Sequence, residues 1–113
     1  MTVVPAVSGE RLLEAWQEML PKVIQPGDGF EIHLEEARQN SLLIHIAVSG
    51  HSMYSFDFRC QYVDDREVKV ELLDAQQGKR HIDERHETVQ QLIEDYVRHI
   101  RECAQKLQGV THA

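Results

Sequence analysis

Four side chains suited to metal binding or proton transfer fall on predicted strands of this chain: His33, His45, Asp57 and Glu71. Imidazole and carboxylate groups together are typical ligands of zinc and other transition metals, and they are also common general acids and bases. If neighbouring strands align their apolar residues, these four positions form one row across a sheet. Side chains directly opposite each other lie about 4.5–5.5 Å apart at Cβ, so the row can share a proton or a divalent cation.

The register behind this row follows from where the apolar residues stand. Every predicted strand carries its apolar side chains at even positions, so two paired residues must both be even or both be odd. A three-residue turn at 38–40 then sets His33 opposite His45. The later hairpins each allow two pairings: His45 with Ser55 or Asp57, and Asp57 with Glu71 or Leu73.

The alternative interpretation of this face is an ordinary solvated surface, because no metal-ligand spacing motif accompanies the row. Leu43, Ala47 and Met53 share the same face and suggest that a second subunit covers part of it.

Gly27 and Gly29 do not form a dinucleotide-binding loop, because the third glycine is missing and a strand follows. We therefore expect neither a resident metal nor a cofactor.

The two cysteines, Cys60 and Cys103, are predicted to be buried core residues rather than nucleophiles. Each falls on an apolar face of its element, where a free cysteine behaves as a small hydrophobic residue. His99 precedes Cys103 by four residues, but two ligands fall short of the usual four, and helix packing explains the pair better. Two cysteines are too few for a secreted disulfide framework, which favours a reducing compartment.

Two helices and four strands must position these side chains. Helical spacing of apolar residues follows Ser8, a suitable N-cap, until Pro21 ends or bends the first helix. In the middle of the chain the period changes to two, which is typical of strands with one buried face. Helical spacing returns after Asp83, a plausible N-cap, and continues to about Leu107, with Gly109 as the stop. The expected strands are 30–34, 42–48, 54–62 and 68–72.

Short connections between the four runs favour an antiparallel meander, because parallel neighbours need a long crossover. The even-numbered face of the sheet should take both helices, and the odd-numbered face should stay open. The sequence therefore predicts an α+β two-layer sandwich in the order α-β-β-β-β-α. We expect one domain spanning 1–113, with a loose lead at 1–7 and a loose tail at 109–113.

The apolar stripe of the last helix is broader than a two-stranded coiled coil requires, so it predicts the lid of the sheet. Its end near Cys103 and Leu107 overhangs the expected sheet and is a candidate subunit contact. A domain of this size buries only a small core, which favours a partner and, as our expectation, a homodimer. The stripe comprises Val89, Ile93, Tyr96, Ile100, Cys103 and Leu107, flanked by Leu92, Val97 and Ala104.

Charge and hydropathy narrow the range of partners. The net charge is −7, from 12 basic and 19 acidic residues, and no basic stripe is present. This balance argues against nucleic acid and suits a basic protein partner or a cation. No apolar run approaches the roughly 18 residues of a membrane span, and the N-terminus lacks the features of a signal peptide. We expect a cytoplasmic protein without membrane contact.

The leading functional prediction is a small, acidic, non-enzymatic interaction or regulatory module, assembled as a homodimer. A metal-dependent or acid–base enzyme that uses the His33, His45, Asp57 and Glu71 row is the first alternative. A carrier of small apolar ligands is the second alternative. The carrier requires a cavity between sheet and helices, near Trp16, Phe56 and Phe58.

Overall fold

The computed structural model describes residues 8–111, apart from 39, 51–52, 65–66 and 84. In this part of the chain, helices accompany a five-stranded antiparallel sheet whose strands lie side by side in chain order. The predicted α+β class and the antiparallel meander are confirmed. The elements are α1 (Gly9–Val23), β1 (Gly29–Leu34), β2 (Ser41–Ala47), β3 (Tyr54–Tyr62), β4 (Val68–Gln77), β5 (Arg80–His81), α2 (Glu87–Lys106) and α3 (Gln108–Thr111).

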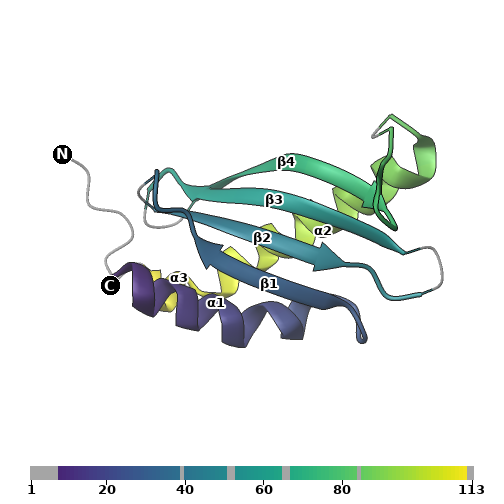
Figure 1. Cartoon of the computed structure of the whole chain (residues 1–113). Helices are drawn as coiled ribbons and strands as arrows, with labels where there is room; N and C mark the ends of the chain where they lie inside the picture. Colours follow the sequence, from purple (N-terminus) through teal and green to yellow (C-terminus); the bar gives the residue numbers. More distant parts are fainter. Residues whose placement is uncertain (1–7, 39, 51–52, 65–66, 84, 112–113) are drawn as a thin grey trace.

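The helices lie together on one side of the sheet, and no described element covers the other side (Figure 1). The strands alternate apolar and polar residues, so each strand presents one face to the helices and one to solvent. On the helix side of the central strands, Ile46, Phe56 and Phe58 are fully buried. The corresponding residues near the start of β4, Val68 and Val70, are only half-buried, so the helices cover this strand less completely.

Helix α1 begins at the predicted N-cap. The Ser8 hydroxyl oxygen accepts a hydrogen bond from the backbone N–H of Arg11 (3.2 Å), which satisfies a free amide of the first turn. Pro21 lies inside the last turn, and the helix ends soon afterwards at Val23. The buried face of the helix consists of Leu12, Ala15, Trp16 and Leu20.

Helix α2 begins later than predicted, at Glu87 with His86 as its N-cap residue. Asp83 instead closes a turn before the helix, because its carboxylate accepts hydrogen bonds from the backbone and the guanidinium of Arg85. The predicted stop at Gly109 is also wrong, since this residue lies inside α3. The expected lead at 1–7 and the last two residues of the expected tail lie outside the described residues.

The fifth strand, β5, is an addition to the four strands that the sequence predicts. The polar residues 75–82 indicate a connection, but β4 continues to Gln77 and returns as β5. Gly78 makes this turn possible by adopting a positive φ of 64°, which side chains with a Cβ rarely tolerate. Its backbone N–H also donates to the carbonyl oxygen of Met53 (2.9 Å), which ties the turn to the connection between β2 and β3.

The core between sheet and helices is packed solid at its aromatic centre. Trp16, Phe56 and Phe58 each have 0% of their surface exposed. A ligand-sized cavity beside these side chains would leave them accessible surface, so the packing leaves no room for the carrier's pocket at this position. The indole N–H of Trp16 donates to the Tyr62 hydroxyl (3.1 Å), which satisfies the buried polar group and links α1 to β3.

The end of α2 is filled by the chain's own core. Cys103 and Leu107, the predicted subunit contact, are 0% and 5% exposed. Both belong to the same buried cluster as Cys60, so neither is available to a second copy in this conformation. Burial raises the pKa of Cys103 to about 12 and also raises the pKa of Cys60, so neither thiol supplies a thiolate near neutral pH.

Asp28 fixes α2 against two loops at one end of the sheet. Its carboxylate accepts a hydrogen bond from the Tyr96 hydroxyl (2.7 Å) and another from the backbone N–H of Ser49 (2.7 Å). It also accepts from the backbone N–H of Gln25 (3.0 Å) within its own loop. One side chain therefore sets the position of the helix relative to the first two strands.

Candidate functional site: the open face of the sheet

The pairing of β1 with β2 differs from the predicted register. Glu31 lies opposite His45, whereas His33 lies opposite Leu43. The predicted juxtaposition of His33 and His45 is therefore wrong. His33 Nε2 instead lies 3.9 Å from the Glu31 carboxylate on its own strand, and both side chains are well exposed.

The length of the connection between β1 and β2 explains this shift. The Glu35 backbone N–H donates to the carbonyl oxygen of Ser41 (3.0 Å), so the ladder continues one residue beyond β1. The loop spans 36–40 rather than 38–40, and Asn40 closes it with a positive φ of 60°. Asparagine tolerates this left-handed conformation better than most residues, which explains its place at the end of the loop.

The pairing of His45 with Asp57 is confirmed. The two residues lie opposite each other on β2 and β3, and His45 Nδ1 is 2.7 Å from an Asp57 carboxylate oxygen. Their side chains are 39% and 41% exposed, so the pair is open to a ligand. The carboxylate fixes the orientation of the imidazole and leaves its other nitrogen, Nε2, without a hydrogen bond to a described residue.

A β-bulge on β4 changes the next member of the row. Asp74, not Glu71, lies opposite Asp57, while Glu71 lies opposite Arg59. Leu73 is the extra residue of the bulge, and it is 44% exposed on the open face. The sequence carries a signal of this bulge, because the inward-facing positions change from even at 68–72 to odd at Ala75, which is buried.

A second histidine–carboxylate pair extends the row onto β5. His81 Nδ1 lies 2.9 Å from an Asp74 carboxylate oxygen, and Gln76 Nε2 donates to the other oxygen (2.9 Å). Strand alternation alone does not bring Asp74 or His81 to the site, because their positions depend on the bulge and on β5. The observed row across the five strands is Glu31, His45, Asp57, Asp74 and His81.

A shallow pocket of about 460 Å³ lies over the centre of this row. Leu43 and Leu73 supply apolar walls, and the carboxylates of Glu31, Asp57 and Asp74 supply negative charge. The pocket therefore combines apolar contact area with hydrogen-bond acceptors. Its lining residues are Glu31, His33, Leu43, Ile44, His45, Asp57, Phe58, Leu73 and Asp74.

Arg59 and Glu35 form a firm border beside the pocket. Two parallel hydrogen bonds of 2.8 Å join the guanidinium to the carboxylate, and the Ser41 hydroxyl donates a third (2.7 Å). Arg59 and Ser41 hold the pKa of Glu35 at about 2, well below its usual value of 4.5. The same pairing raises the pKa of Arg59, so both groups stay charged across the physiological range.

The pocket on the open face brings acid–base side chains together with apolar ones. Among the described residues, no three His, Cys, Asp or Glu side chains are grouped as metal ligands. The side chains that line the pocket include no serine, threonine, cysteine or lysine that could act as a nucleophile. The His45–Asp57 pair can accept or donate a proton, and Glu31, His33 and Asp74 are further acid–base groups of the same lining.

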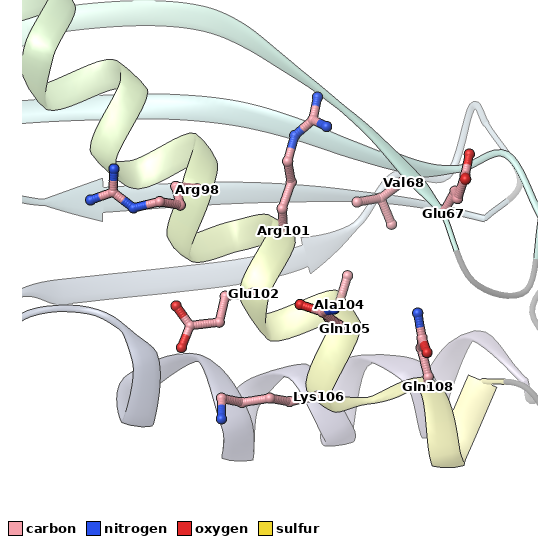
Figure 2. A pocket seen from close by; sticks show the side chains of 9 residues that line it. All are labelled: Glu67, Val68, Arg98, Arg101, Glu102, Ala104, Gln105, Lys106 and Gln108. Atoms are coloured by element: carbon pink, nitrogen blue, oxygen red, sulfur yellow. The ribbon is translucent and has the colours of Figure 1, made fainter.

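A second hollow, of about 920 Å³, lies between the last turns of α2 and the start of β4 (Figure 2). Arg101 and Lys106 pair with no acidic side chain of the described residues, whereas Arg98 lies 3.1 Å from Asp95. Arg98 and Arg101 leave α2 in different directions, so they do not converge on one small anion (Figure 2). The lining residues are Glu67, Val68, Arg98, Arg101, Glu102, Ala104, Gln105, Lys106 and Gln108.

Comparisons with protein-family models, with curated proteins and with solved structures find no match to this chain. In the part of the chain that the structure describes, no helix is both long and apolar enough to cross a membrane. Function must therefore be inferred from the residues of the open face and of the hollow beside α2.

Proposed function

We propose that this chain is a non-catalytic interaction module that binds a basic segment of a partner protein on the open face of its sheet. The observation that carries the proposal is the pocket over the Glu31–His45–Asp57–Asp74 row, which joins apolar walls to a carboxylate rim. No described helix covers this face, so an extended segment can reach it without displacing part of the fold. We also propose that the module works as a homodimer.

The charge of the molecule supports a basic partner. The net charge of −7 attracts a cationic segment over distances of about 8–10 Å at moderate salt and raises its rate of association. On the open face, Glu31 and Asp74 add their carboxylates to the charge of the Asp57 carboxylate beside His45. A second copy of the same face would be repelled, so this surface suits a partner of opposite charge.

The pocket also has the form expected for a long basic side chain. The methylene groups of arginine or lysine can lie against Leu43 and Leu73, and the charged end can then reach Asp57 or Asp74. Arginine gains more, because its planar guanidinium pairs with a carboxylate through two hydrogen bonds. We therefore expect arginine to be preferred to lysine in the bound segment.

Fluorescence anisotropy with two labelled peptides tests this proposal. One peptide alternates arginine and leucine, and the control peptide of equal length alternates glutamate and leucine. We expect the arginine peptide alone to bind, with an affinity that falls as salt is added. Equal binding of both peptides, or no binding of the arginine peptide at low salt, would contradict the proposal.

Matched variants locate the binding on the open face. Asp57→Asn should weaken binding of the arginine peptide about twofold to fivefold, because an exposed charge pair contributes about 0.5–1 kcal/mol. Glu10→Gln removes the same charge from an exposed position on α1 and should leave binding unchanged. Equal losses in the two variants would indicate attraction by net charge alone.

A further inference from the structure

The outer edge of β4 is open along most of its length. β5 pairs only with Gln76 and Gln77, and Ile82 donates one further backbone hydrogen bond to Ala75. On this outer side, opposite β3, no other described strand lies beside residues 68–74. An open strand edge presents unpaired N–H and C=O groups, and it is a template for pairing with another chain.

The hydrogen bonds of the neighbouring turn show which groups face this edge. The carbonyl oxygen of Glu67 accepts from the backbone N–H of Val63, so Glu67 directs its carbonyl group toward β3, while its N–H donates to the Asp64 carboxylate in the turn. Along an antiparallel strand, successive residues direct their backbone N–H and C=O groups to opposite sides of the strand. Val68, Val70 and Leu72 therefore present their N–H and C=O groups at the open edge.

The bulge limits the length of edge that can pair. A regular ladder breaks at Leu73, where the bulge adds an unpaired residue, and β4 itself begins at Val68. The segment available for regular pairing is therefore 68–72, and its midpoint is Val70.

We propose that a second copy of this chain pairs with β4 edge to edge, antiparallel, with the two-fold axis at Val70. This inference rests on the proposed homodimer and specifies its interface. The axis pairs Val70 with its own counterpart, Val68 with Leu72, and Lys69 with Glu71 of the second copy. Both copies therefore contribute the same surface to the interface, as two-fold symmetry requires.

The segment is self-complementary in this register. Val68, Val70 and Leu72 all present backbone groups at the edge, so they form the hydrogen-bonded pairs of the new ladder. Lys69 and Glu71 occupy the non-hydrogen-bonded pairs, where opposite side chains lie closest. Opposite charges therefore meet on the open face, and apolar side chains meet on the helix side.

The helix side of β4 supplies the rest of the interface. Val68, Val70 and Leu72 are only half-buried, so the chain itself leaves this strand incompletely covered. The hollow between α2 and β4 borders the same edge. Its lining includes both basic and acidic side chains, such as Arg101 and Glu102 (Figure 2). In the proposed dimer, the hollows of the two copies lie on either side of the axis. The strand contact alone is too small to hold a dimer, and the α2 surfaces beside the hollows enlarge the interface.

Sedimentation velocity at micromolar concentration tests this interface through exchanged charges. The dimer contains two pairs of residue 69 with residue 71, one on each side of the axis. Lys69→Glu and Glu71→Lys each place like charges in both pairs, so each should raise the dimer dissociation constant about tenfold. An equimolar mixture of the two variants restores opposite charges in both pairs and should restore the dimer. Lys79→Glu, in the turn before β5, is the control for charge and should sediment like the unaltered chain.

Val70→Pro provides an independent test, because proline removes the N–H that faces the open edge and leaves the bonds to β3 in place. It should give a monomer whose circular dichroism matches that of the unaltered chain. An unaltered chain that sediments as a monomer would overturn both the homodimer and this interface. A dimer that survives Lys69→Glu and Glu71→Lys, alone and mixed, would overturn the interface and leave the homodimer standing.

Discussion

At the scale of single residues, the open face is organised by paired charges rather than by isolated ones. His45 is held by Asp57, His81 by Asp74, and Arg59 by Glu35. Each pair limits the movement of its side chains, so the pocket has a defined lining before any partner binds. This preorganisation lowers the entropy cost of binding an extended segment.

The Glu35–Arg59 pair gives the fold a specific dependence on pH. Glu35 has a pKa of about 2 in the folded chain, below its usual value of 4.5, so its ionised form favours folding. This stability is fully present above about pH 4.5 and is lost as the pH falls toward 2. Glu35→Gln should therefore have a lower free energy of unfolding than the unaltered chain at pH 6. Between pH 4.5 and 2, this free energy should fall less in the variant than in the unaltered chain.

Urea unfolding at several pH values measures this difference. Glu36→Gln is a suitable control, because Glu36 is exposed and makes no ion pair with a described residue. The control should keep the pH dependence of the unaltered chain. Parallel curves for Glu35→Gln and the unaltered chain would show that the ion pair does not stabilise the fold.

Met53 is a strained residue whose replacement should stabilise the chain. It adopts a positive φ of 57° and is 67% exposed, so its side chain gains little from packing. Met53→Gly should raise the free energy of unfolding by about 0.5–1 kcal/mol, because glycine adopts this conformation without a Cβ clash. Urea unfolding measures the gain. Met53→Ala keeps the Cβ and should give none, and an equal gain from both variants would contradict the explanation by strain.

At the scale of elements, the sequence predicts the strands well and the ends of the row poorly. Alternation of apolar residues is enough to place β2 against β3, so His45 and Asp57 are correctly paired. His33 and Glu71 are misplaced for two local reasons, the longer β1–β2 loop and the bulge at Leu73. The longer loop leaves the apolar residues at even positions, so their parity cannot reveal it.

The bulge on β4 should matter for binding more than for folding. Deletion of Leu73 restores an unbroken alternation, in which Asp74 still faces Asp57 and Ala75 still faces inward. We expect the free energy of unfolding to change by less than about 1 kcal/mol, as for a surface change, while one apolar wall of the pocket is lost. Affinity for the arginine peptide should fall, as it should for Leu73→Ser, which keeps the bulge.

Chemical denaturation and anisotropy on the same samples separate these two effects. Unchanged affinity in both variants would remove Leu73 from the binding surface. A large loss of stability on deletion alone would contradict the expected separation, because it would show that the bulge is part of the fold's own packing.

At the scale of the whole molecule, the two proposed surfaces have separate roles: the β4 edge forms the dimer, and the open face binds the partner. Pairing at β4 about an axis at Val70 joins two sheets into one, with the helices of both copies on the same side. The two open faces then also lie on one side, each with its own pocket. A partner with two basic segments can occupy both pockets at once, and it would then bind more tightly than one segment alone.

Backbone chemical-shift mapping of the arginine peptide on the ¹⁵N-labelled chain tests the central claim most directly. We predict that the largest shifts fall on the open face, at Glu31, Leu43, His45, Asp57 and Asp74. Residues that line only the hollow between α2 and β4, such as Arg101 and Gln105, should change little. Shifts concentrated on that hollow, or spread evenly over the molecule, would contradict the assignment of the open face as the binding surface.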